Sequence, residues 1–309
     1  MGVLGSRGFI GGHVVRALRR RGYEVRTVAA PHVVSAARDS SSVLAEIERQ
    51  RDAQLRLRSS LAGCRVVINA AGLAEPGAAA SDSLLGANAV LPGVVCRALA
   101  EAGAARLVHV SSAAVQGCRS VLDESLETQP FSPYSLSKAL GEWSVVRCAA
   151  TLEAVIYRPT SVHSEDRRTT RRLSRLARSP LASVAGEGNR ATPQVLVENV
   201  ADGIAAAATR DEPVQGVVLQ PHEGWTCEGF LLMLSQTTRP VTHVRSSLAA
   251  RLVSGGYWVG RRVRPMTAVT RRIDMLWLGQ EQVTGQLTEW GWRPPAGHHR
   301  WAELAEAVA

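Results

Sequence analysis

The sequence predicts a doubly wound α/β fold, with a parallel sheet and a smaller, mainly C-terminal lobe. Over the first half of the chain, short apolar runs alternate with helical stretches, as they do in consecutive βαβ units. The loop GSRGFIG lies between the first apolar run and the first helical stretch. Past residue 220 the alternation ends, and five of the seven tryptophans lie beyond residue 250. The change of pattern marks the expected lobe.

The elements follow in order along the chain. A first strand leads into the glycine loop and a helix that ends near residue 21. The remaining strands are expected at 23–29, 65–69, 106–111, 153–157 and 216–220. The remaining helices are expected at 40–61, 83–102, 133–150 and 198–208. Proline at position 133 suits the first turn of a helix. We expect a sheet domain over 1–162, joined by 196–220, and a substrate-binding lobe over 163–195 and 221–309.

Composition excludes several classes of protein. No uncharged apolar run of about 20 residues appears, so we expect no transmembrane helix. The glycine motif begins at Gly5, which leaves no room for a leader, and a cytoplasmic protein is expected. Five cysteines occur singly, without a CxxC pair, which argues against a disulfide framework and against a metal site.

Charge is the next feature, at +9 with a pI near 10.1. Arginine supplies all but one of the 36 basic residues, so the charge reflects a preference for arginine wherever a cation serves. The single lysine, Lys138, indicates a position that needs an amine. Five arginines share one helical face, which is either solvated or a cleft wall for a diphosphate: Arg168, Arg171, Arg172, Arg175 and Arg178. No aromatic residues are interleaved with them, so nucleic-acid and membrane-surface binding are not expected.

Gly5, Gly8 and Gly11 form GxxGxxG between a strand and a helix. Glycine permits a tight turn and lets the backbone approach a pyrophosphate at the helix N-terminus, where free N–H groups and the helix dipole favour anions. In this setting the motif predicts dinucleotide binding on a Rossmann-type sheet.

The opening GSRGFIGGHVV resembles that of extended short-chain dehydrogenases/reductases, the NAD-dependent epimerase/dehydratase family. Further matches follow in the family's order: NAAG at 69–72, Asn88, SSAAVQG at 111–117, YSLSK at 134–138, YRPTSV at 157–162, VENVADGI at 197–204 and GWRP at 291–294. The chain departs from the family pattern at Val115-Gln116-Gly117 and Val162-His163-Ser164, where VYG is usual. These departures concern the rim of the pocket.

Tyr134 and Lys138 are four residues apart and share a helical face. A nearby ammonium lowers the pKa of a phenol, which prepares it to exchange a proton. The resemblance implies a catalytic set of Ser112, Tyr134 and Lys138. It also implies contacts to a nicotinamide cofactor from Gly5, Arg7, Gly8, Phe9, Ile10, Gly11, Ala70, Ala71, Gly72, Asn88, Ser111, Tyr134, Lys138 and Pro159, although a structural role is favoured for Ser111.

The reaction is narrowed by two further residue patterns. Ala113-Ala114 stands where 4,6-dehydratases of the family carry an acid pair, so that activity is not expected. No carboxylate follows the second strand to bind the ribose 2′-hydroxyl of NAD, and Arg7 suits the 2′-phosphate of NADP. We therefore expect an NADPH-dependent ketoreductase acting on a nucleotide sugar. An NAD-dependent sugar-nucleotide epimerase is the alternative, and a non-catalytic NAD(P)-sensing regulator is less favoured because the tyrosine and lysine are intact.

The resemblance also suggests substrate contacts and an assembly. Arg190, Arg264 and Arg271, with Arg272 as an alternative, are the candidate contacts to a nucleotide. A homodimer through the helices at 83–102 and 133–150 is open to the chain, because both segments carry alanine-rich faces.

Overall fold

The computed structural model describes residues 1–74, 79–214, 216–237, 239–260 and 262–309, without the side chains of 264, 265 and 268. Its centre is a six-stranded sheet in which every pair is parallel. From one edge to the other the strands are β10 (Gly216–Leu219), β6 (Glu153–Arg158), β4 (Arg106–Val110), β3 (Val66–Asn69), β1 (Gly2–Leu4) and β2 (Arg26–Val28). The chain leaves β1 toward β2 and returns to β3 on the other side, so the glycine loop lies at a topological switch point. The expected α/β fold is confirmed.

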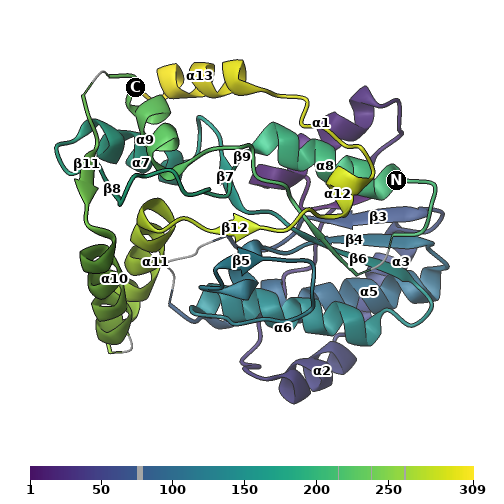
Figure 1. Ribbon diagram of the computed structural model, residues 1–309. Helices are drawn as coiled ribbons and strands as arrows, with labels where there is room; N and C mark the ends of the chain where they lie inside the picture. Colours follow the sequence, from purple (N-terminus) through teal and green to yellow (C-terminus); the bar gives the residue numbers. More distant parts are fainter. Residues whose placement is uncertain (75–78, 215, 238, 261) are drawn as a thin grey trace.

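Helices cover both faces of the sheet (Figure 1). On one face α1 (Phe9–Arg20) packs against α8 (Val197–Thr209). The other face carries α3 (Arg51–Ser60), α5 (Leu91–Ala102) and α6 (Pro133–Cys148), which pack side by side. Two apolar clusters fill the space between the sheet and these layers. The doubly wound arrangement expected from the strand and helix pattern is therefore present.

The segment 40–61 departs from the single helix that the sequence predicts. It forms α2 (Ser40–Arg49) and α3, separated at Gln50. The side-chain amide of Gln54 donates to the carbonyl of Ile47 at 2.7 Å and satisfies the end of α2. Helix α2 packs on α5 and α6, with Ile47 fully buried beside Gly93. Part of the surface expected to pair with a second copy is thus covered within the chain, and the dimer stays a prediction.

The helical stretch before β4 is continuous but irregular. It begins as α4 (Asp82–Leu85), passes through a π-helical turn at Gly86–Val90, and continues as α5. This is the one helix of the described residues that is long and apolar enough to cross a membrane, and 78% of its most apolar window is buried inside the fold. It is packed as a core helix between α3, α6 and the sheet.

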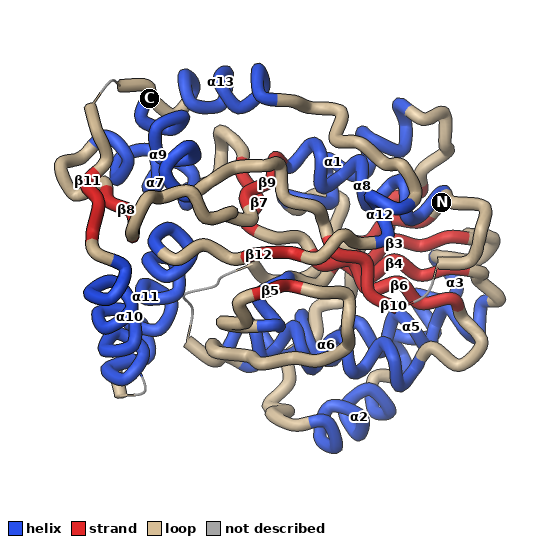
Figure 2. Tube along the Cα trace, in the orientation of Figure 1, coloured by secondary structure: helices blue, strands red, loops and turns tan. Residues whose placement is uncertain are grey.

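The lobe lies at the carboxyl end of the sheet, where Figure 2 shows short strands among helices. Its strand pairs are β7 (Ser161–His163) with β9 (Gln194–Leu196) and β8 (Ser183–Ala185) with β11 (Thr242–Val244). Its helices are α7 (Arg168–Arg178), α9 (Cys227–Ser235), α10 (Ser246–Gly260), α11 (Arg264–Trp277) and α13 (His298–Ala307). A third apolar cluster, which includes Phe230 and Trp301, joins α7, α9, α11 and α13, and α10 packs against α11.

One C-terminal segment packs with the sheet instead of the lobe. Strand β12 (Glu281–Gln282) pairs with β5 (Val121–Leu122), and Leu287 of α12 (Gln286–Glu289) joins the apolar cluster under α8. Trp290 and Trp292 pack against the same cluster. The expected division into 1–162 with 196–220, and 163–195 with 221–309, stays a prediction. Within it, residues 281–292 lie on the sheet side.

Candidate active site

The glycine loop after β1 is built for close approach of backbone to backbone. Gly5 has φ +75°, and a Cβ there would lie 2.5 Å from the amide nitrogen of Ala71. A Cβ at Gly11 would collide with the carbonyl of Gly5. Gly8 is the N-cap of α1 and offers no side-chain cap, so amide donors of the first turn stay free for an anion. These residues fit the pyrophosphate of a dinucleotide.

A cavity of about 640 Å³ opens beside this loop, between the sheet and the lobe. Many of the residues expected to hold cofactor or substrate line it: Gly8, Phe9, Ile10, Ala70, Gly72, Ser111, Ser112, Tyr134, Lys138, Pro159 and Arg271. Gly5, Gly11, Ala71 and Asn88 shape the backbone around the cavity without lining it. Arg7 is exposed on the loop and does not line it either. The cavity has the size of a small-molecule site.

Asn88 supports the site from behind. Its side-chain amide donates to the carbonyl of Leu73 at 2.9 Å and to Ser137 at 3.1 Å, and its carbonyl accepts from the amide of Leu73. Gly72 is bounded by this side chain, since an added Cβ would lie 2.7 Å from Asn88 Oδ1 and 3.1 Å from Lys138 Nζ. The asparagine and the glycine together leave space around the lysine ammonium.

The three expected catalytic side chains face the same cavity. Lys138 is 5% exposed, and its Nζ donates to the carbonyl of Val110, at the end of β4, over 3.1 Å. Burial lowers the pKa of Lys138 to about 8, and the nearby Glu142 carboxylate opposes that change. Burial raises the pKa of the Tyr134 phenol, against a hydrogen bond with Ser112 and the charge of Arg167. The pKa of the phenol is therefore raised, and not lowered as the nearby Lys138 led us to expect, so Tyr134 is a protonated acid at neutral pH.

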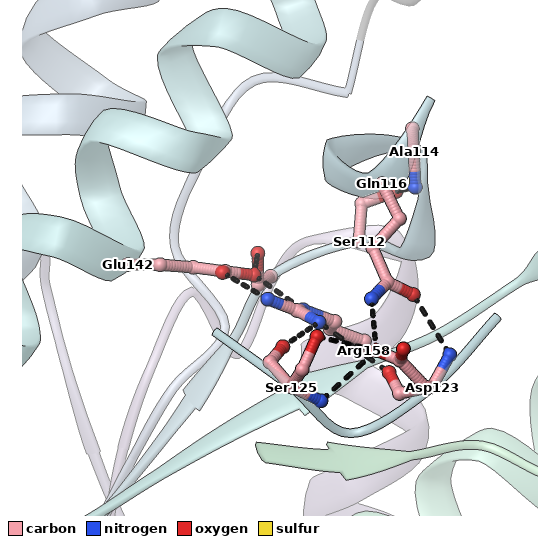
Figure 3. A network of polar contacts seen from close by, with 8 residues as sticks. Ser112, Ala114, Gln116, Asp123, Ser125, Glu142 and Arg158 are labelled. Carbon is pink, nitrogen blue, oxygen red and sulfur yellow. Dashed lines mark hydrogen bonds and ion pairs between the residues drawn. The ribbon is translucent and has the colours of Figure 1, made fainter. Parts of the chain in front are cut away.

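A polar network built on the buried Arg158–Glu142 pair lies near Ser112 (Figure 3). Ser111 Oγ donates to Glu142 Oε1 at 2.5 Å, so its hydroxyl is engaged behind the cavity. Arg158 of β6 forms two bonds to the Glu142 carboxylate, at 2.9 and 2.7 Å. Ser112 caps the turn Ala113–Gln116 by accepting from the amide of Ala114 at 3.2 Å. The structural role favoured for Ser111 agrees with these contacts.

His163 stands where the family pattern has a tyrosine, and it is a buried structural residue. Its ring nitrogens lie 2.7 Å from Gln194 Oε1 and 3.1 Å from Thr170 Oγ1. Burial lowers its pKa to about 4, so the imidazole is neutral at physiological pH. It is absent from the cavity lining, and none of the described lining residues is a histidine, aspartate or glutamate.

The lobe contributes arginines that the sequence pattern only partly identified. Arg271 lines the cavity and is held by Asp274 at 2.9 Å and Gln280 at 2.5 Å. Arg172 and Arg272 also line it, and burial together with the charge of Arg172 lowers the pKa of Arg272. Neither has an ion-pair partner among the described residues. Two adjacent cations without carboxylates favour an anionic ligand.

Arg190 is not part of this group. It is exposed, reaches only the carbonyl of Leu278 at 3.4 Å, and does not line the cavity. The side chain of Arg264 lies outside the described residues. Of the five arginines on α7, the cavity is lined by Arg172 alone.

Arg167 is a site residue that no sequence pattern predicts. Its guanidinium lies 4.9 Å from the centre of the Phe9 ring and donates to the carbonyl of Val162 at 2.9 Å. It lines the cavity, and its charge acts on Tyr134. No motif distinguishes it from its arginine neighbours in the chain, because only the fold brings residue 167 to the glycine loop.

Comparison with known proteins places the chain in a family. The model of the NAD dependent epimerase/dehydratase family matches residues 1–219. No curated protein matches the chain by sequence. The human epimerase family protein SDR39U1 with NADPH aligns at TM-score 0.67 and 18% identity over 99% of both chains.

Two other solved structures are similar over nearly their whole length. UDP-glucuronic acid 4-epimerase from Bacillus cereus with NAD aligns at TM-score 0.65 and 17% identity, over 100% of this chain and 96% of that one. MoeE5 with UDP-glucose and NAD aligns at TM-score 0.64 and 21% identity, over 99% and 97%. With the glycine loop, the parallel sheet and the family match over 1–219, the chain belongs to the NAD dependent epimerase/dehydratase family of nicotinamide-dependent enzymes.

Proposed function

We propose that the protein is an NADPH-dependent ketoreductase acting on a nucleotide sugar. The observation that carries this proposal is the composition of the cavity. Its reacting end presents two hydroxyls and an ammonium, from Ser112, Tyr134 and Lys138, and no described carboxylate or imidazole lines it. Ala113 and Ala114 line it at the position where water elimination needs an acid and a base. Carbonyl reduction needs one proton donor, and Tyr134 meets that need.

The residues around the cavity have different roles in such a reduction. The glycine loop and the first turn of α1 would hold the cofactor, which supplies a hydride when bound. Ser112 donates a hydrogen bond to the substrate carbonyl oxygen and orients it. Tyr134 would donate its phenolic proton to that oxygen, so the phenol O–H bond breaks as the alcohol O–H bond forms. Lys138 stabilises the phenolate that remains until solvent returns a proton.

A nucleotide sugar is supported by the charge of the lobe side. Arg172 and Arg272 line the cavity without ion-pair partners among the described residues, and their planar groups suit diphosphate oxygens. Of the similar structures, one holds UDP-glucose and another is a UDP-glucuronic acid 4-epimerase. NADPH is supported by the missing carboxylate after β2 and by the NADPH-bound human relative.

The proposal is tested by adding NADPH and a panel of nucleotide ketosugars to the purified enzyme. We expect NADPH to be consumed in one-to-one proportion with alcohol formed. An enzyme that interconverts nucleotide-sugar epimers without net consumption of cofactor would instead be the NAD-dependent epimerase. That second function is favoured by the NAD-bound 4-epimerase among the similar structures.

A further inference from the structure

Helices α10 and α11 form a hairpin at the side of the lobe. They pack against each other, and α10 lies on the outer side of α11, away from the sheet (Figure 1). Ala249 and Val253 are the buried apolar residues of α10. Beside these residues, and not opposite them, α10 has an open face.

That open face is apolar where solvent exposure predicts polar residues. Leu248 is 50% exposed, Leu252 is 54% exposed and Val259 is 38% exposed. The spacing of four and seven residues puts these three side chains on one stripe of the helix. Trp258 beside the stripe is 60% exposed, more than any other aromatic side chain among the exposed large hydrophobic residues described. Such a stripe on one helix is the pattern of a surface that is covered in use.

The same hairpin is strongly basic. Residues 245–277 contain seven arginines and a single acidic residue, Asp274. Asp274 is already engaged by Arg271 and by the hydroxyl of Tyr257 at 2.8 Å. Arg251 lies one turn from Leu248, and the guanidinium of Arg262 lies 4.9 Å from the Trp258 ring centre. We call Leu248, Arg251, Leu252, Trp258, Val259 and Arg262 the docking face.

The charge and the apolar surface of the docking face indicate which kind of partner fits it. A second copy docked symmetrically would bring the arginines of both chains together in a desolvated interface, which is unfavourable. Nucleic acid would neutralise the arginines but leave Leu248, Leu252 and Val259 without apolar cover. A bilayer with anionic headgroups satisfies both features, because acyl chains take the leucine stripe and headgroups take the guanidinium groups. Tryptophan is well suited to the boundary between the two.

The hairpin of α10 and α11 adjoins the cavity. On α11, Val269 is 46% exposed and Ile273 is 38% exposed, and both also line the cavity. The wall there continues inward through apolar side chains: Leu173, Leu176, Leu276 and Trp277. The hairpin thus contributes part of the cavity wall.

We propose that the α10–α11 hairpin docks this protein on an anionic lipid surface through the docking face. The arginine-rich segment at 168–178 gave no reason to expect membrane binding, because it carries no aromatic residue. The docking face differs, since Trp258 and the leucines are interleaved with Arg251 and Arg262. Docking is independent of the ketoreductase reaction and is measured without substrate.

The test is sedimentation of the full chain with vesicles of phosphatidylglycerol mixed into phosphatidylcholine, and with vesicles of phosphatidylcholine alone. We expect binding to the anionic vesicles that weakens as salt rises. Leu252→Glu should reduce this binding by about tenfold or more, because it places a charge in the apolar stripe. Leu126→Glu is the matched control, since Leu126 is also 54% exposed but lies outside the hairpin. It should bind like the unchanged protein.

The arginines need a separate control, because the whole chain is basic. Arg251→Glu and Arg56→Glu change the net charge equally, and Arg56 lies on α3, outside the hairpin. Selective loss in Arg251→Glu supports the proposal. Equal loss in both variants, equal binding to vesicles of phosphatidylcholine alone, or no vesicle binding overturns it. Light scattering that shows a dimer lost in Leu252→Glu also overturns it, in favour of a second copy.

Discussion

Arg158 and Glu142 form a buried ion pair directly behind the serines of the active site. The Arg158 side chain is fully buried and that of Glu142 is 3% exposed, and two bonds of 2.7 and 2.9 Å join them. Arg158 also donates to the carbonyl of Ser125 at 2.7 Å, and Glu142 accepts from Ser111. The pair therefore connects α6, β6 and the turn that carries Ser112 (Figure 3).

Breaking this pair on one side should destabilise the fold strongly. Arg158→Met leaves the Glu142 carboxylate buried without its partner, and we expect a loss of about 3–5 kcal/mol in the free energy of unfolding. Urea denaturation measures it. The double variant Arg158→Met/Glu142→Leu should recover part of that loss, because it leaves no uncompensated charge. If the double variant loses as much stability as Arg158→Met and Glu142→Leu lose together, the two residues do not act as a pair.

Tyr134→Phe tests the proton donor. The change removes only the hydroxyl, so the variant should fold and bind cofactor as before while its turnover falls by about 10²–10⁴-fold. Initial rates and a fluorescence titration of cofactor measure the two properties. Phe131→Leu is the matched control, because it alters a cavity residue that has no acidic proton to donate. Turnover retained in Tyr134→Phe would remove this residue from the chemistry.

Lys138 makes the free energy of unfolding of the cofactor-free protein depend on pH. Burial lowers its pKa from 10.5 to about 8, so the unfolded chain binds more protons than the folded chain between these values. The free energy of unfolding therefore gains a contribution as pH rises through this window, up to about 2 kcal/mol between pH 8 and 10. Below pH 8 the cost of the buried charge is fully present. Chemical denaturation of wild type and Lys138→Met, compared at each pH, isolates the gain, and parallel curves would refute it.

The arginines at the cavity predict how a nucleotide is bound. Arg272→Met should weaken the binding of UDP by about tenfold, because a charged hydrogen bond to phosphate is lost. Arg190→Met is the control, since Arg190 is exposed and lies outside the cavity lining. Calorimetry with UDP separates the two variants without any turnover. Equal effects, or a loss confined to Arg190→Met, would move the nucleotide away from the lobe arginines.

Much of the fold was predictable because local sequence patterns determine its strands and helices. Apolar runs gave the six sheet strands, and the glycine loop gave the switch point. The break at Gln50 was not predictable, because it depends on a buried contact between Gln54 and the carbonyl of Ile47. The short strands outside the central sheet were not predictable for a related reason, since each has two or three residues and pairs with a distant segment.

The candidate site, like the fold, was predictable only in part. Ser112, Tyr134 and Lys138 meet at one cavity because strand ends and a helix face place them there, and those features follow from sequence spacing. Arg167 and Arg190 illustrate what spacing cannot give. One joins the cavity and the other faces outward, although both lie in arginine-containing segments between β6 and α8.

The cofactor preference tests the proposed ketoreductase most directly. Purified protein, first checked for nucleotide carried through purification, is titrated calorimetrically with NADPH and with NADH. We expect NADPH to bind at least about tenfold more tightly than NADH, a difference of roughly 1.4 kcal/mol. Tighter binding of NADH, or NAD that arrives already bound, would contradict it and indicate an epimerase that retains its cofactor.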